Sequence, residues 1–203
     1  MERQQEDLWD KLRACTLCAE QFVATQSAHL PRPVFQGRPR ARILIAGQAP
    51  GARVYCSGRP FTDPSGNRLR QWMQVEEDRF YDPDNIAILP MAFCFPGYDA
   101  KGADLPPPKI CAATWRREVL DLFPALELTL LIGGYAQKWH LQNAGSVRET
   151  VANWRSYAPH TIPLPHPSWR NNAWLAKNSW FAEDLLPYLQ RRIQEVLSDE
   201  RRQ

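Results

Sequence analysis

Two short segments contain the residue types best suited to hold and polarise a small ligand. The first is Gly47-Gln48-Ala49-Pro50-Gly51, followed by SGRPF over 57–61. Its glycines let backbone N–H groups approach an anion or a carbonyl group closely. The second is His166-Pro167-Ser168, in which prolines on both sides of the histidine fix an imidazole that can stabilise developing negative charge. Taken singly, each also fits a plain loop or a structural histidine.

Four of the five cysteines are spaced as metal ligands. Cys15 and Cys18 form a C-x2-C pair, and Cys94 and Cys111 stand at the two ends of a proline-rich segment. Four thiolates suit either zinc or an iron–sulfur cluster. One metal-binding pair with two unrelated core cysteines is the alternative. Cys56 is expected to pack in the core or to remain a free thiol.

Apolar runs and stretches of helical periodicity alternate along the chain. They predict the strands and helices that position the two site motifs. Strands are expected at 41–47, 86–92, 126–132 and 160–164, and helices at 2–18, 67–75, 110–122, 136–142 and 178–196. Pro187 predicts a kink or break in the last helix. The alternation predicts an α/β fold with a largely parallel sheet. The loops that begin at Gly47 and Pro165 would then meet at the carboxyl edge of the sheet, where such folds bind ligands.

Length and composition limit the classes of protein. With 203 residues, 44% hydrophobic and 23% charged, the chain is expected to form one globular domain over 1–203. A net charge of +3 is too small for a general nucleic-acid coat protein. No apolar run approaches the roughly 18 residues of a membrane span. The charged N-terminus lacks the apolar region of a signal peptide, so we expect a cytoplasmic protein, by default a monomer.

Together these motifs resemble the iron–sulfur branch, family 4, of the uracil-DNA glycosylase superfamily. That branch carries a CxxC pair, then GEAPG and TGRPF, two further cysteines around a proline-rich loop, and a late HPS or HPA motif. The resemblance runs from Cys15 to the last helix. It implies a three-layer α/β/α fold with a central four-stranded parallel sheet. It also implies a 4Fe-4S cluster, with zinc as the alternative, on Cys15, Cys18, Cys94 and Cys111.

The resemblance further implies roles for residues of the two site motifs. Such an enzyme flips a damaged base out of DNA into a pocket. Phe61 would stack on the base, His166 would stabilise its carbonyl oxygen during bond cleavage, and Gln48 would hold the attacking water. Arg170 and Asn171 would contact DNA, with Arg170 binding phosphate or filling the vacated stack. The implied substrate-binding residues are Gly47, Ala49, Pro50, Gly51, Phe61 and Ser168.

Three positions depart from the family pattern. Gln48 replaces a glutamate, and Ala49 stands where another branch has a catalytic aspartate, so this motif offers no carboxylate base. Pro90 replaces the asparagine that reads the uracil edge, and proline offers no N–H donor. We therefore expect a DNA-repair glycosylase that removes a deaminated base, first of all uracil, and leaves an abasic site. Without a lysine in either motif it would be monofunctional.

Other hypotheses remain open from the sequence. The same departures fit a pocket for hypoxanthine or xanthine, or a weak or inert member that binds DNA or damaged bases without uracil turnover. A further hypothesis is that the chain is an unrelated α/β protein with a four-cysteine zinc site.

Overall fold

The fold is built on one parallel sheet. In the computed structural model, which describes residues 2–142 and 145–198, the strands are β1 (Ile43–Ala46), β2 (Ile86–Ile88), β3 (Leu128–Ile132) and β4 (Thr161–Leu164). Their order is β2-β1-β3-β4, and every neighbouring pair is parallel. Ile45 is in register with Leu130, and Ile132 with Leu164. All four strands therefore end at one edge, as the α/β prediction requires.

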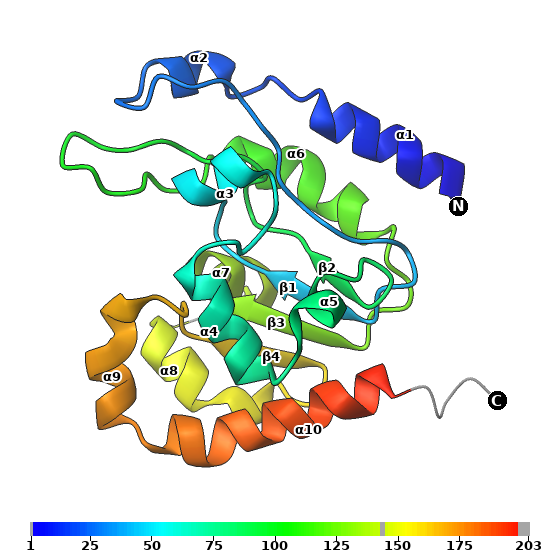
Figure 1. Cartoon of the computed structure of the whole chain (residues 1–203), viewed down its shortest axis with the longest axis vertical. Helices are drawn as coiled ribbons and strands as arrows, with labels where there is room; N and C mark the ends of the chain where they lie inside the picture. The colour runs from blue at the N-terminus through cyan, green and yellow to red at the C-terminus, as the bar shows by residue number, and fades with distance from the viewer. Residues whose placement is uncertain (1, 143–144, 199–203) are drawn as a thin grey trace.

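Helices cover both faces of the sheet (Figure 1). Their bounds are α1 Glu2–Arg13, α2 Ala19–Val23, α3 Ala52–Ser57, α4 Pro64–Met73, α5 Glu77–Phe80, α6 Lys109–Leu120, α7 Gly134–Leu141, α8 Val147–Ala152, α9 Asn172–Lys177 and α10 Leu186–Leu197. The expected three-layer α/β/α architecture is confirmed.

Alternation along the strands divides the core in two. Ile43 and Ile45 of β1 face α4, α8 and α10, where they join Leu69 and Leu189 in the larger buried cluster. Leu44, between them, faces the opposite way and packs with residues of α1 and α6. Because side chains of a strand point alternately to the two faces, a continuous apolar strand needs cover on both sides.

The N-terminal helix is shorter than predicted. The expected helix over 2–18 ends at Arg13, and Cys15 and Cys18 stand in the turn before α2. The N–H of Cys15 bonds to Leu12 O, a tighter closure than that of an α-helix. Cysteine and threonine are weak helix formers, so the chain leaves the helix here at little cost. The turn directs both cysteines toward the loop between β2 and α6.

The C-terminal helix contains the predicted irregularity. Residues 181–185 form a π-helical turn, and α10 begins at Leu186 with Pro187 in its first turn. Proline lacks an N–H, so it fits the start of a helix, where that donor has no partner. The continuous helix expected over 178–196 is thus divided just before its proline.

Other expected boundaries shift by a few residues, and short elements were missed. The strand expected over 86–92 stops at Ile88, and α4 starts at Pro64 rather than at 67. Helices α3, α5, α8 and α9 contain four to six residues each, too few to show a periodic pattern. Among the described residues, no helix is long and apolar enough to cross a lipid bilayer.

Candidate functional site at the carboxyl edge of the sheet

The predicted site motifs lie where β1, β3 and β4 end. Gly47 follows β1 directly, Gly133 follows β3, and His166 stands two residues after β4. The N–H of Gly133 bonds to Leu164 O at 2.9 Å, and a Cβ built on Gly133 would lie 3.9 Å from the Cβ of His166. Adjacent strands therefore bring the histidine beside the end of β3, as the parallel topology predicts.

The first motif is held by the backbone of the neighbouring segment. Gly47 O and Gln48 O accept the N–H groups of Met91 and Ala92 at 2.9 and 3.0 Å. Pro50 is buried, and Gly51 is the residue from which α3 starts. The methyl group of Ala49 packs against the cluster around α1 and α6. The position where a related branch has an aspartate is thus directed into the core.

Phe61 lies over the first motif in a constrained conformation. The end of its ring is close to Gly47, at 3.7 Å from a Cβ built there. Its φ is +54°, a left-handed value that a phenylalanine adopts only when its surroundings hold it. Gly66 permits this turn, because a Cβ at that position would lie 1.8 Å from Phe61 O. The predicted stacking residue is therefore fixed beside the strand end.

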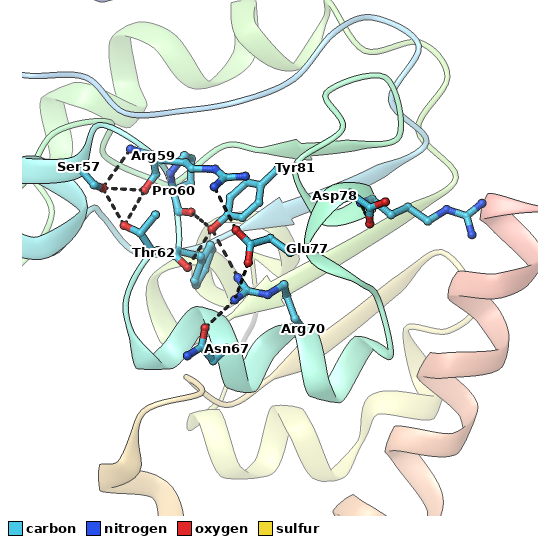
Figure 2. A network of polar contacts seen from close by, with 11 residues as sticks. Ser57, Arg59, Pro60, Thr62, Asn67, Arg70, Glu77, Asp78 and Tyr81 are labelled. Atoms are coloured by element: carbon cyan, nitrogen blue, oxygen red, sulfur yellow. Dashed lines mark hydrogen bonds and ion pairs between the residues drawn. The ribbon is translucent and has the colours of Figure 1, made fainter.

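A polar network supports the same turn from the other side (Figure 2). The hydroxyl of Tyr81 donates to Pro60 O at 2.8 Å and to Phe61 O at 3.1 Å. The Arg59 guanidinium lies 3.4 Å from the centre of the Tyr81 ring and also pairs with Glu77 at 3.1 Å. Arg70 completes the network, with a donor 3.5 Å from the Tyr81 hydroxyl. No motif in the sequence predicts this contribution of α5.

His166 is held in its neutral form. Burial lowers the pKa of its imidazole below the ordinary value, although the nearby carboxylates of Asp63 and Asp104 act in the opposite direction. The cation of Arg170 adds to the lowering of this pKa. A neutral imidazole can donate one hydrogen bond to an oxygen that becomes negative.

Asp63 and Asp104 were absent from the sequence-based site. Asp63 caps α4, since its carboxylate accepts the N–H of Gly66 at 3.1 Å. The sequence Asp63-Pro64 is a helix-start signal that places this carboxylate just after Phe61. Asp104 stands in an antiparallel bridge with Tyr98, so the proline-rich segment forms a hairpin. Partial desolvation raises the pKa of Asp104, although Arg170 and His166 lower it.

The loop after His166 is tied to itself and to α4. Asn171 Nδ2 donates to His166 O at 2.7 Å, and Ser168 Oγ accepts the N–H of Arg170 at 3.2 Å. Arg68 of α4 donates to Ser168 O at 3.1 Å and to the Asn172 side chain at 2.7 Å. Ser168 and Asn171 thus shape the loop, while Arg170 and Trp169 extend outward.

The four predicted ligand cysteines converge on one small cavity. Cys15, Cys18, Cys94 and Cys111 all line it, together with apolar residues such as Phe22 and Pro108. Burial and the other nearby thiols raise the pKa of Cys94 to about 12, and burial raises that of Cys111 to about 11. The fifth, Cys56, is exposed, so the expectation that it is either packed or free resolves to an exposed thiol.

Four cysteine thiols line the cavity, and thiols are the donors that a zinc ion or an iron–sulfur cluster would use. Within 2–142 and 145–198, no group of three or more His, Cys, Asp or Glu side chains is arranged to hold one metal ion. Trp115 also lines the cavity, and its buried indole N–H has no acceptor among the described residues. The N–H of Phe93 already points to Cys111 Sγ at 3.4 Å. N–H donors directed at sulfur are a usual feature of iron–sulfur sites.

Two wider grooves lie elsewhere. One of about 660 Å³ runs beside α1 and the loops at 35–38 and 58–60, and one of about 480 Å³ lies between α8 and α9. Neither is lined by Gly47, Phe61 or His166.

Comparison with known families agrees with this geometry. A family model described as the uracil DNA glycosylase superfamily matches residues 34–190, which include β1 to β4 and both site motifs. The match begins after Cys18, so it leaves the first cysteine pair outside.

Proposed function

The chain belongs to the uracil DNA glycosylase superfamily, and from that premise we propose that it is a DNA-repair glycosylase of the iron–sulfur branch. It hydrolyses the bond between a deaminated base and deoxyribose and leaves an abasic site. One observation carries the proposal: the Phe61 ring beside Gly47 and the neutral imidazole of His166 stand at the same edge of the sheet.

Bond cleavage places negative charge on the leaving base and positive charge on the sugar. As that negative charge grows, His166 donates a hydrogen bond to the base carbonyl oxygen. It acts as a neutral imidazole, which stabilises the charge through one N–H and does not have to transfer its proton. The backbone N–H groups of Gln48 and Ala49 bind the base edge. Gln48 holds the attacking water through its amide, which cannot itself accept a proton at neutral pH. The proton that the water loses when it bonds to the sugar passes, directly or through solvent, to the base that departs as an anion.

The loop over 168–172 is the proposed DNA contact. Trp169 is 73% exposed, and the Arg170 guanidinium lies 5.9 Å from its ring centre. An exposed indole beside the catalytic histidine is suited to fill the space left by a flipped base. We assign the filling of this space to Trp169, a residue for which the sequence motifs indicated no role. We assign phosphate binding to Arg170.

The four cysteines would hold the cluster. When bound, a 4Fe-4S cluster supplies a rigid metal–sulfur crosslink and the capacity to exchange an electron. Cys15 and Cys18 would thereby join the N-terminal turn to the loop that leads through Asp104 to α6. The buried thiols of Cys94 and Cys111 would lose their protons on binding, as metal-bound thiols do.

Pro90 stands where the family 4 branch has the asparagine that reads the uracil edge. Pro90 is buried, and its carbonyl oxygen accepts a bond from Arg116 at 3.3 Å. We therefore propose that backbone groups of the first motif read the base edge. Uracil is the first substrate to test, and hypoxanthine and xanthine are the next.

An oligonucleotide panel tests the activity. Labelled strands carrying uracil, hypoxanthine or xanthine, single- and double-stranded, are incubated with cluster-loaded protein and then cleaved with alkali. We expect scission at the uracil site and a loss of on the order of a hundredfold or more for His166→Ala. Full activity in that variant would refute the role of His166. Binding without scission on every strand would favour an inert, DNA-binding member.

The assignment of Trp169 has its own control. Trp169→Ala should lower activity on duplex more than on single-stranded DNA, because only the duplex has a stack to refill. Leu30→Ala removes another exposed apolar side chain, 66% exposed, and should leave that ratio unchanged. An equal loss on both substrates would argue against stacking by Trp169.

A further inference from the structure

The groove of about 480 Å³ between α8 and α9 adjoins the proposed DNA contact (Figure 1). The loop over 168–172 runs directly into α9, which begins at Asn172. At roughly 1.5 Å per helical residue, Ala173 and Lys177 of the groove lie within about 8 Å of that point along the helix. A DNA strand held at the loop can therefore continue into the α8–α9 groove.

Each helix contributes a cation and an alanine to this groove. Arg148 and Ala152 share one face of α8, and Ala173 and Lys177 share one face of α9, because residues four apart in a helix are neighbours on its surface. The small alanine side chains leave space between the helices. Both cations are exposed and can reach a ligand that enters this space.

Neither cation of the groove is paired within the described part of the chain. Among residues 2–142 and 145–198, no carboxylate forms an ion pair with Arg148 or Lys177. The lining also contains Glu149, but its carboxylate accepts the N–H and the hydroxyl of Ser146 at 2.9 and 2.8 Å in a helix cap. The groove therefore offers two positive charges to an anion.

The larger groove beside α1 differs in this respect. Its arginines Arg13, Arg38 and Arg59 each pair with a carboxylate, at 3.2, 3.0 and 3.1 Å. A phosphate would have to displace these carboxylates before it could bind there. Between α8 and α9, nothing comparable has to be displaced from the two cations by an incoming phosphate.

Two indoles line the same groove and are held in place. Trp174 and Trp180 are half-buried, with ring centres 5.8 Å apart and ring planes at 89°. Asn178 connects them, because its amide donates to Trp174 O at 2.7 Å and accepts the indole N–H of Trp180 at 3.1 Å. Fixed aromatic rings beside cations are the elements that bind single-stranded nucleic acids, through base stacking and phosphate contacts.

We infer that the α8–α9 groove binds unpaired nucleotides of the substrate strand next to the flipped base. Arg148 and Lys177 contact its phosphates, and Trp174 and Trp180 contact its bases. The inference rests on the proposed glycosylase function for the identity of this strand. Paired bases hide their faces in the stack, so the groove favours single-stranded over duplex DNA.

Direct binding tests the charges of the groove without base excision. The probe is a labelled oligothymidylate of about 12 nucleotides, within the usual site size, titrated with the full-length protein at several salt concentrations. Arg148→Gln combined with Lys177→Gln should weaken binding about tenfold and reduce the slope of log K against log salt by about 1.4, because two phosphate contacts are lost. Lys11→Gln combined with Arg191→Gln removes the same charge from exposed positions of α1 and α10 and should match wild type.

A second variant tests the space for bases. Ala173→Leu fills the groove, whereas Ala176→Leu adds the same bulk at an exposed position of α9 outside the lining. The second probe is a strand of equal length without bases. Wild type should bind the oligothymidylate about tenfold more tightly than this strand, because its bases stack. Ala173→Leu should lose most of that difference, and Ala176→Leu should keep it.

Two results would overturn the inference: unchanged affinity and salt slope in the Arg148→Gln, Lys177→Gln protein, or equal binding of the two probes by wild type. Uracil excision is measured separately. Excision without groove-dependent binding would refute only the groove, and groove-dependent binding without excision would refute only the glycosylase. If both hold, the groove variants should lose more activity on single strands than on duplex, the reverse of Trp169→Ala.

Discussion

The guanidinium of Arg68 donates to the carbonyl oxygen of Ser168 at 3.1 Å, and this bond joins the two halves of the candidate site. Arg68 belongs to α4, the helix that starts next to Phe61. Ser168 belongs to the loop that starts at His166. The stacking residue and the imidazole, over 100 residues apart in sequence, are thus tied by one side chain.

Arg68→Met should therefore lower kcat/KM for base excision by on the order of 10- to 100-fold, because small displacements of a catalytic group carry losses of this size. Thermal stability should change little, since Arg68 is only half-buried. Arg53→Met, which removes an exposed arginine from α3, is the control. Wild-type activity in Arg68→Met would show that the two loops hold their positions without this tie.

Tyr81→Phe should weaken base binding while the ring remains against Arg59. The variant loses the hydroxyl that donates to Pro60 O and Phe61 O, a net contribution of about 1 kcal/mol, or roughly fivefold in kcat/KM. Steady-state kinetics on uracil-containing single strands measures the change. Tyr135→Phe alters an exposed tyrosine outside the network and should have no effect. An effect of equal size there would contradict the explanation.

The loss of activity at low pH should follow the protonation of the His166 imidazole, which forms the acidic limb of the pH–activity profile. Because the pKa of His166 is lowered, the imidazole stays neutral and active as the pH falls below about 6.5, its ordinary pKa. Asp63 and Asp104 favour the protonated form, so Asp63→Asn or Asp104→Asn lowers this pKa further. The acidic limb then moves to lower pH.

Asn remains a good helix cap at position 63, so Asp63→Asn should stay folded. Asp99→Asn, in the same hairpin as Asp104, is the control and should leave the profile in place. A shift of the acidic limb to higher pH in either site variant would contradict the assignment of this limb to His166.

Gly66→Ala should destabilise the fold by about 3 kcal/mol or more, because its Cβ would meet Phe61 O at 1.8 Å and backbone must move. Gly51→Ala is the matched control: a Cβ there meets nothing within 4 Å. We expect it to remain within about 1 kcal/mol of wild type. Denaturant unfolding measures both, and equal stabilities would show that the Phe61 turn relaxes without cost.

The sequence by itself determined the parallel α/β fold, because four apolar runs alternate with helical segments and leave few other arrangements. It also indicated that the loops after Gly47 and Pro165 share one edge. Pro187 marked the irregularity of the last helix, since the cause is local: proline lacks an N–H. Boundaries near Cys15 and Ile88 were misjudged, because there tertiary contacts outweigh weak local preferences.

Only the tertiary structure decided which distant groups act together. Asp104 is near His166 because a hairpin folds back, and Tyr81 supports Phe61 because α5 packs beside that turn. In sequence, Arg116 is one more charge on a helix, and only the structure shows that it is completely buried against His140. Local patterns reflect forces between neighbours in sequence, whereas the electrostatics of a site depend on distance and burial. The distances between groups far apart in sequence, and their burial, are set only when the chain folds.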